Sequence, residues 1–100
     1  MQIRYSEIAK SSLKQNIEFL KFLWTPKELD VFLSDVEIVL QNLKNGNFNQ
    51  YKIEKKNIRS VLIGKKHVKM YFRKESEELI RVLLFFEMRQ DPQKITKLLK

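Results

Sequence analysis

The sequence predicts an α+β fold in which one domain spans residues 1–100. The expected order is a short N-terminal strand, an antiparallel helical hairpin, a three-stranded antiparallel β-meander and a short C-terminal helix. In the first half, apolar residues recur three and four positions apart, as on one side of a helix. In the second half they alternate with polar residues or run together, as in strands. A chain of this length can bury one modest core but not two.

The first three elements follow from local signals. In residues 1–5, Ile3 and Tyr5 fall on one side and Arg4 on the other, which indicates a brief strand. Ser6 is a suitable N-cap for a helix over about 6–23, whose apolar positions are Ala9, Leu13, Ile17, Leu20 and Trp24. Thr25-Pro26-Lys27-Glu28 combines a cap, a first-turn proline and a capping-box glutamate, so a second helix begins there and ends at Lys44-Asn45-Gly46. Because almost no loop separates the helices, we expect an antiparallel hairpin.

Strand patterns dominate the remainder. The β-rich segment 58–63 is followed by Gly64-Lys65, a suitable two-residue turn. Residues 66–73 alternate, with Val68, Met70 and Phe72 on one face and His67, Lys69, Tyr71 and Arg73 on the other. After a turn at 75–77, the apolar segment 79–86 is typical of a central strand covered on both faces. Asp91 and Pro92 then begin a short final helix.

Composition excludes several classes of protein. There is no cysteine and only one histidine, His67. This argues against disulfides and metal sites, and we expect neither a metal nor a cofactor. The N-terminus lacks a signal-peptide pattern, and no apolar run approaches the length of a membrane span. We therefore expect a cytoplasmic protein without a membrane partner.

The formal charge of +8 is concentrated in one part of the chain. Residues 1–50 and 75–100 each balance, whereas residues 52–74 carry nine basic side chains against Glu54 alone. The basic residues are Lys52, Lys55, Lys56, Arg59, Lys65, Lys66, Lys69, Arg73 and Lys74. Such a block favours an anionic partner. The alternative is a lysine-rich surface that only keeps the protein in solution.

The order and spacing of these elements resemble the RelE/ParE toxins of bacterial type II toxin-antitoxin systems. Tyr5-Ser6 with the following helical stripe is similar to the opening of that family, and Trp24 with Phe32 is similar to its helical hairpin. The segments 58–59 and 64–71 resemble its middle hairpin. The strand 80–86 followed by Arg89-Gln90-Asp91-Pro92 resembles its C-terminal signature. The resemblance implies a toxin and a cognate acidic antitoxin that binds it.

Two activities occur within this family. If the chain is RelE-like, the resemblance implies that it cuts messenger RNA on the ribosome. Such cleavage needs a base for the 2′-hydroxyl, a cation for the charge on the phosphate and an acid for the leaving oxygen. Aligned by hand, the family's basic strand positions fall on Arg59, Val61 and Val68, and the expected C-terminal aromatic falls near Ile95. The catalytic candidates are Arg59 and Arg89, which resemble basic positions of the family, and His67 and Tyr71, which could stand in for the missing acid and base. ParE-like members poison DNA gyrase without chemistry of their own, and the incomplete ribonuclease set favours this branch.

The resemblance implies that the basic residues bind the antitoxin first of all, and the target, gyrase or the ribosome, second. These binding candidates are Lys52, Lys55, Lys56, Arg59, Lys65, Lys66, Lys69, Arg73 and Arg89. A different hypothesis is a basic nucleic-acid-binding module that stacks bases on Tyr71 or Phe72. A third is an interaction domain without toxicity.

Overall fold

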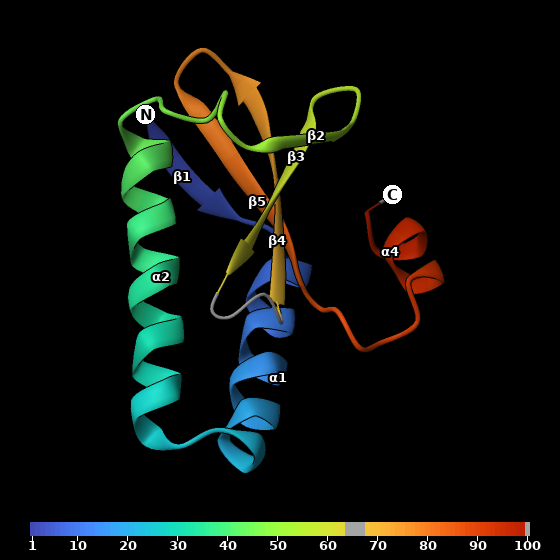
Figure 1. Ribbon diagram of the computed structural model, residues 1–100. Helices are drawn as coiled ribbons and strands as arrows, with labels where there is room; N and C mark the ends of the chain where they lie inside the picture. Colours follow the sequence, from blue (N-terminus) through green and yellow to red (C-terminus); the bar gives the residue numbers. More distant parts are fainter. Residues whose placement is uncertain (64–67, 100) are drawn as a thin grey trace.

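One mixed β-sheet separates two long helices from a short C-terminal helix in the computed structural model, which describes residues 1–63 and 68–99 (Figure 1). In chain order the elements are β1 (Gln2–Tyr5), α1 (Glu7–Leu23), α2 (Pro26–Lys44), β2 (Lys52–Lys55), β3 (Ile58–Ile63), β4 (Val68–Ser76), β5 (Leu79–Glu87) and α4 (Gln93–Leu98). The predicted α+β class is confirmed.

The sheet is larger than the predicted meander. Its five strands follow the order β1-β5-β4-β3-β2. The β3, β4 and β5 strands are antiparallel neighbours as expected, but β1 pairs with β5 in parallel and β2 adds an antiparallel edge beside β3. The predicted turn at Gly64-Lys65 lies outside the described residues. The later turn falls at 77–78, because β4 continues to Ser76.

The two long helices form a layer on the sheet rather than a hairpin held by its own contacts. Only Trp24 and Thr25 separate them, and the predicted capping box is present. The Glu28 amide donates to Thr25 Oγ1 at 3.2 Å, and the Thr25 amide donates to Glu28 Oε1 at 3.1 Å. Both helices turn their apolar sides toward the strands, and α1 packs mainly on β5. The sheet offers the larger apolar surface, so the two helices bury their apolar sides against it more than against each other.

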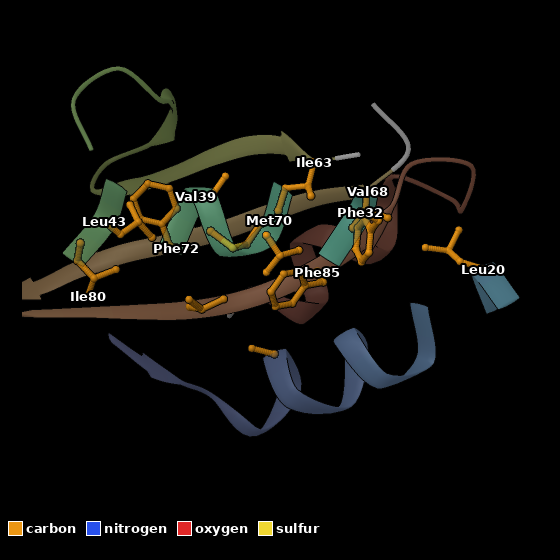
Figure 2. Packing of buried hydrophobic residues seen from close by; sticks show 13 residues of the cluster. Leu20, Phe32, Val39, Leu43, Ile63, Val68, Met70, Phe72, Ile80 and Phe85 are labelled. Atoms are coloured by element: carbon orange, nitrogen blue, oxygen red, sulfur yellow. The ribbon is translucent and has the colours of Figure 1, made fainter. Parts of the chain in front are cut away.

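The main core lies between this helical layer and the sheet. Figure 2 shows Leu43, Val39 and Phe32 of α2 gathered with apolar side chains of β4 and β5. The β4 contributors are those that alternation predicted: Val68, Met70 and Phe72, each at most 1% exposed. Burying side chains of this size contributes about 1.5–3 kcal/mol each, which makes this layer the principal stabilising contact.

The N-terminal segment and α1 together cover the outer edge of β5. Strand β1 pairs with β5 only as far as Tyr5 and Val82. Beyond that point Ser12 Oγ accepts a hydrogen bond from the Phe85 amide at 3.0 Å, and Asn16 Nδ2 donates to the Phe85 carbonyl at 3.0 Å. Side chains of α1 therefore replace the missing strand partner, which a buried backbone requires.

A β-bulge in β5 lies where β1 gives way to α1. Tyr71 pairs with Leu84 and Phe72 with Val82, so Leu83 is the extra residue. Ser6, the N-cap of α1, donates from its hydroxyl to the Leu83 carbonyl at 3.0 Å. The Ser6 hydroxyl thus fixes the start of α1 to the bulge. Beyond the bulge, the alternation of side chains along β5 is shifted by one residue.

Candidate binding surface

The α4 face is the side of the sheet on which α4 packs, opposite α1 and α2 (Figure 1). Its side chains include Lys52, Glu54, Ser60, Lys69, Tyr71, Arg73, Arg81, Leu84 and Phe86. Helix α4 lies over part of it through Ile95, Leu98 and the following Leu99. No residue of α4 is itself buried, so the helix covers the sheet with a thin apolar contact.

Glu54 lies among the basic residues of this face and holds two of them. Its Oε1 atom is 3.0 Å from Lys69 Nζ and 3.7 Å from Lys52 Nζ. It also accepts a hydrogen bond from the Ser60 hydroxyl at 2.7 Å. Burial acts to raise the pKa of Glu54, but the hydrogen bonds from Ser60 and Lys69 and the lysine charges outweigh it and lower the pKa. Lys69 is therefore an internally paired cation, with a side chain only 14% exposed.

Tyr71 is a packing residue beneath α4. It is 3% exposed, and Lys69 Nζ lies 5.7 Å from the centre of its ring. Burial, with a smaller effect of the Glu54 charge, raises the pKa of its phenol. A cavity of about 220 Å³ lies beside it, lined by Glu54, Lys55, Tyr71, Pro92, Ile95, Thr96 and Leu99. The phenol of Tyr71 therefore keeps its proton to a higher pH than an exposed tyrosine, and it borders a small pocket roofed by α4.

Three arginines lie in one transverse row at the other end of the α4 face. Arg73 of β4 is the register partner of Arg81 of β5, which is in turn the partner of Arg4 of β1. One carboxylate serves two of them: Glu75 Oε1 is 2.7 Å from Arg81 Nε and 3.1 Å from Arg73 Nη2. These hydrogen bonds lower the pKa of Glu75, that from Arg81 having the larger effect.

A second group of cations lies on the opposite side of the sheet, around Phe48. Arg59 donates to the Tyr51 carbonyl at 2.9 Å, and its guanidinium carbon is 5.9 Å from the centre of the Phe48 ring. Lys74 Nζ lies 5.5 Å from the same ring. Together with Lys56 these residues line a cavity of about 240 Å³. Arg59 thus helps to hold the segment before β2 in place.

Arg89 is tied to the end of β5. Its Nε donates to Glu87 Oε1 at 2.7 Å, and its guanidinium carbon lies 5.4 Å from the centre of the Phe19 ring. Glu87 is 2% exposed, so the pair anchors the chain as it leaves the sheet. Its contacts are therefore with the end of α1 and with Glu87, away from Tyr71.

The predicted catalytic candidates do not converge. Arg59 and Tyr71 lie on opposite faces of the sheet, because they occupy positions of opposite alternation in β3 and β4. Arg89 lies past the end of β5. His67 lies outside the described residues, as do two of the binding candidates, Lys65 and Lys66.

The structure brings together a different set. Of the predicted binding residues, four share the α4 face, namely Lys52, Lys55, Lys69 and Arg73. Lys56 and Arg59 gather on the other side with Lys74. Sequence reasoning missed Arg4 and Arg81. Two signals were available. Arg81 is the one charged residue in the apolar segment 79–86, and Arg4 lies on the side of the first strand opposite Ile3 and Tyr5.

Comparison with protein-family models found no match, and neither did comparison with curated proteins. None of the helices within residues 1–63 and 68–99 has the length and apolar character needed to cross a membrane. Over the same residues, no three His, Cys, Asp or Glu side chains are placed to hold a metal ion.

Proposed function

We propose that this chain is the toxin of a type II toxin-antitoxin pair: a growth inhibitor that a cognate acidic antitoxin neutralises, acting as a ParE-like poison of DNA gyrase. The observation that carries the proposal is the set of cations on the α4 face, the side of the sheet that α1 and α2 leave uncovered. Four strands contribute to it, with Lys52 from β2, Arg73 from β4, Arg81 from β5 and Arg4 from β1. A display of this kind suits an anionic protein partner.

The state of the catalytic candidates supports the non-catalytic branch. A ribonuclease site needs a cation directed at the phosphate and an acid near the leaving oxygen. Arg59 donates to the Tyr51 carbonyl, and Arg89 is paired with the buried Glu87. Tyr71 is buried with a raised pKa. These groups are engaged in holding the fold, which favours inhibition by binding over cleavage.

The RelE-like alternative keeps one specific observation in its favour. Lys52, Lys69 and Tyr71 share a face with the cavity beneath α4, so a movement of α4 would expose a phenol beside two lysines. In that case the chain would cut mRNA on the ribosome. A basic nucleic-acid-binding module without toxicity is the remaining alternative, and the cations around Phe48 would be its phosphate contacts.

Inducible expression in a bacterial host tests the proposal. Growth, pulse-labelled protein synthesis and the supercoiling of a reporter plasmid are followed from the moment of induction. We expect growth to stop and plasmid supercoiling to fall before protein synthesis does. Co-expression of an acidic protein encoded beside this chain should restore growth.

Two results would decide against it. Immediate arrest of protein synthesis with cuts in mRNA would replace the ParE-like mechanism by the RelE-like one. Unimpaired growth at an expression level where the folded chain is abundant would refute the toxin function itself.

A further inference from the structure

The arginine row of Arg4, Arg81 and Arg73 is an unfavourable arrangement for the isolated chain. Residues directly opposite each other on antiparallel strands, as Arg73 and Arg81 are, have Cβ atoms about 4.5–5.5 Å apart, and like charges at that spacing destabilise a sheet. Among the described residues, Glu75 is the one carboxylate within ion-pair distance of the row, and it contacts Arg73 and Arg81 only. The row thus carries a surplus of two positive charges that the fold itself does not use.

A groove runs beside two of these arginines and is apolar over much of its surface. Its volume is about 230 Å³, and its lining is Ser6, Ile8, Arg73, Arg81, Leu83, Leu98 and Leu99. Ile8 is 39% exposed, and Leu83 is the extra residue of the β-bulge. One wall of the groove is therefore cationic, and the rest comes from α1, β5 and the end of α4.

Glu75 indicates which anion suits this site. One oxygen of its carboxylate accepts from both Arg73 and Arg81, at 3.1 and 2.7 Å, and these hydrogen bonds lower its pKa. A guanidinium pair that already holds a carboxylate from its own chain has the geometry to hold one from another chain. Glu75 is in effect an internal competitor for the ligand.

We propose that the groove and the arginine row bind an acidic peptide segment of a partner chain, whose carboxylates meet the arginines while its apolar side chains contact Ile8, Leu83 and Leu98. A nucleic-acid backbone could satisfy the arginines, but its phosphates and sugars would leave the apolar lining without a partner. The proposal rests on the proposed function in that the partner is the acidic antitoxin, and it adds where that partner binds. The proposed surface thereby combines the predicted binding residue Arg73 with Arg4 and Arg81, which were not among the predicted residues.

Fluorescence anisotropy with the purified full chain tests this binding directly. The probe is a short fluorescein-labelled peptide containing glutamate and leucine, and two matched peptides replace all glutamates by glutamine or all leucines by serine. We expect the first peptide to bind and both replacements to weaken it. Amide chemical shifts in NMR spectra should change at Arg4, Arg73, Arg81 and Leu83.

Paired variants locate the site. Arg73→Gln with Arg81→Gln should weaken binding about tenfold or more, as expected for the loss of two charge-assisted hydrogen bonds. The control, Lys14→Gln with Lys27→Gln, removes the same charge from exposed positions on the two helices and should change the affinity by less than about twofold, since screened charges contribute little. Circular dichroism confirms that each variant is folded.

Glu75→Gln gives a test of opposite sign. Removing the internal competitor should tighten peptide binding, whereas a Glu75 that merely held the arginines in place would leave it weaker. Weaker binding in this variant would overturn the proposal. So would an equal loss in the two double variants, no binding of the first peptide, or tighter binding of a single-stranded oligonucleotide of matched charge at the same salt concentration.

Failure here is distinct from failure of the proposed function. The peptide experiment uses purified protein and requires no toxicity. A chain that binds the peptide through the row but leaves bacterial growth unimpaired would refute the toxin function alone, while a toxic chain without peptide binding would refute the groove alone.

Discussion

Glu54 is the only acidic residue between positions 52 and 74. Its carboxylate contacts three side chains. It pairs with Lys69 and Lys52 and accepts from Ser60. A single residue thus makes Lys69, one of the predicted binding cations, part of the fold, while the Lys52 side chain stays 70% exposed. In the sequence, Glu54 only lowers the net charge of residues 52–74 by one. Which side chains it contacts depends on the pairing of the strands, which the sequence does not show.

Glu54→Gln tests this role through pH. Because the folded pKa of Glu54 lies below the ordinary value, its ionised form stabilises the fold above about pH 4.3, and that stability is lost as the pH falls through the folded pKa. The variant should lose about 1 kcal/mol of unfolding free energy at pH 7, since the pair is partly in solvent. Its unfolding free energy should fall less steeply than that of the wild type between about pH 5 and pH 3.

Urea denaturation at a series of pH values makes this measurement. Glu77→Gln is the matched control, because the Glu77 side chain is 95% exposed and faces Lys74 at 3.6 Å. If Glu54→Gln and Glu77→Gln have the same pH profile, the pairing described for Glu54 is wrong.

Lys56 occupies the turn between β2 and β3 with a positive φ of 43°. This left-handed conformation costs a residue with a Cβ atom roughly 1 kcal/mol, and glycine adopts it freely. Lys56→Gly should therefore raise the melting temperature by about 4–8 °C. Lys55→Gly, one position earlier in the strand, should lower it, and a fall in both variants would contradict the strain at Lys56. Thermal unfolding followed by circular dichroism distinguishes the outcomes.

At the scale of elements, the sequence predicted what local patterns encode. The capping box at Thr25 and Glu28 located the start of α2, and the alternation of Val68, Met70 and Phe72 identified the buried face of β4. Strand β2 was missed because its Lys-Ile-Glu-Lys sequence has one apolar residue, Ile53, which is exposed. Charged sequence of this kind is common in edge strands, where it discourages pairing with other chains.

The parallel pairing of β1 with β5 could not be read from local patterns. It joins residues nearly eighty positions apart, and the hydrogen bonds that extend it come from side chains of α1. Nothing in the spacing of Ser12 and Asn16 distinguishes a partner of a strand edge from an ordinary polar helical position. A bulge at Leu83 also leaves no trace in a continuous apolar run.

Asn16→Ala tests the covering of this edge. Asn16 is 4% exposed, and the substitution leaves the Phe85 carbonyl without its donor. An unsatisfied buried polar group costs about 1–3 kcal/mol of unfolding free energy. Gln15→Ala, at the neighbouring exposed position, should change stability by less than about 0.5 kcal/mol. Chemical denaturation of both variants gives the comparison, and equal stabilities would contradict the edge-covering role of Asn16.

At the scale of the whole molecule, strand alternation divides the basic block that appears continuous in the sequence. Lys52, Lys69 and Arg73 lie on the α4 face, while Arg59 and Lys74 lie on the other side near Phe48. The sheet then adds Arg81 and Arg4 to the first group through pairings between distant segments. The concentration of charge was therefore predictable, but its division between two faces and its extension to β1 required the register of the sheet.

The central claim is that this chain inhibits by binding. The most direct test adds the purified chain to purified DNA gyrase with relaxed plasmid, and in parallel to ribosomes carrying mRNA. The account predicts that gyrase loses supercoiling activity as the chain is added, while the mRNA stays intact. Full gyrase activity in excess of the chain, with mRNA cut on the ribosome, would contradict it.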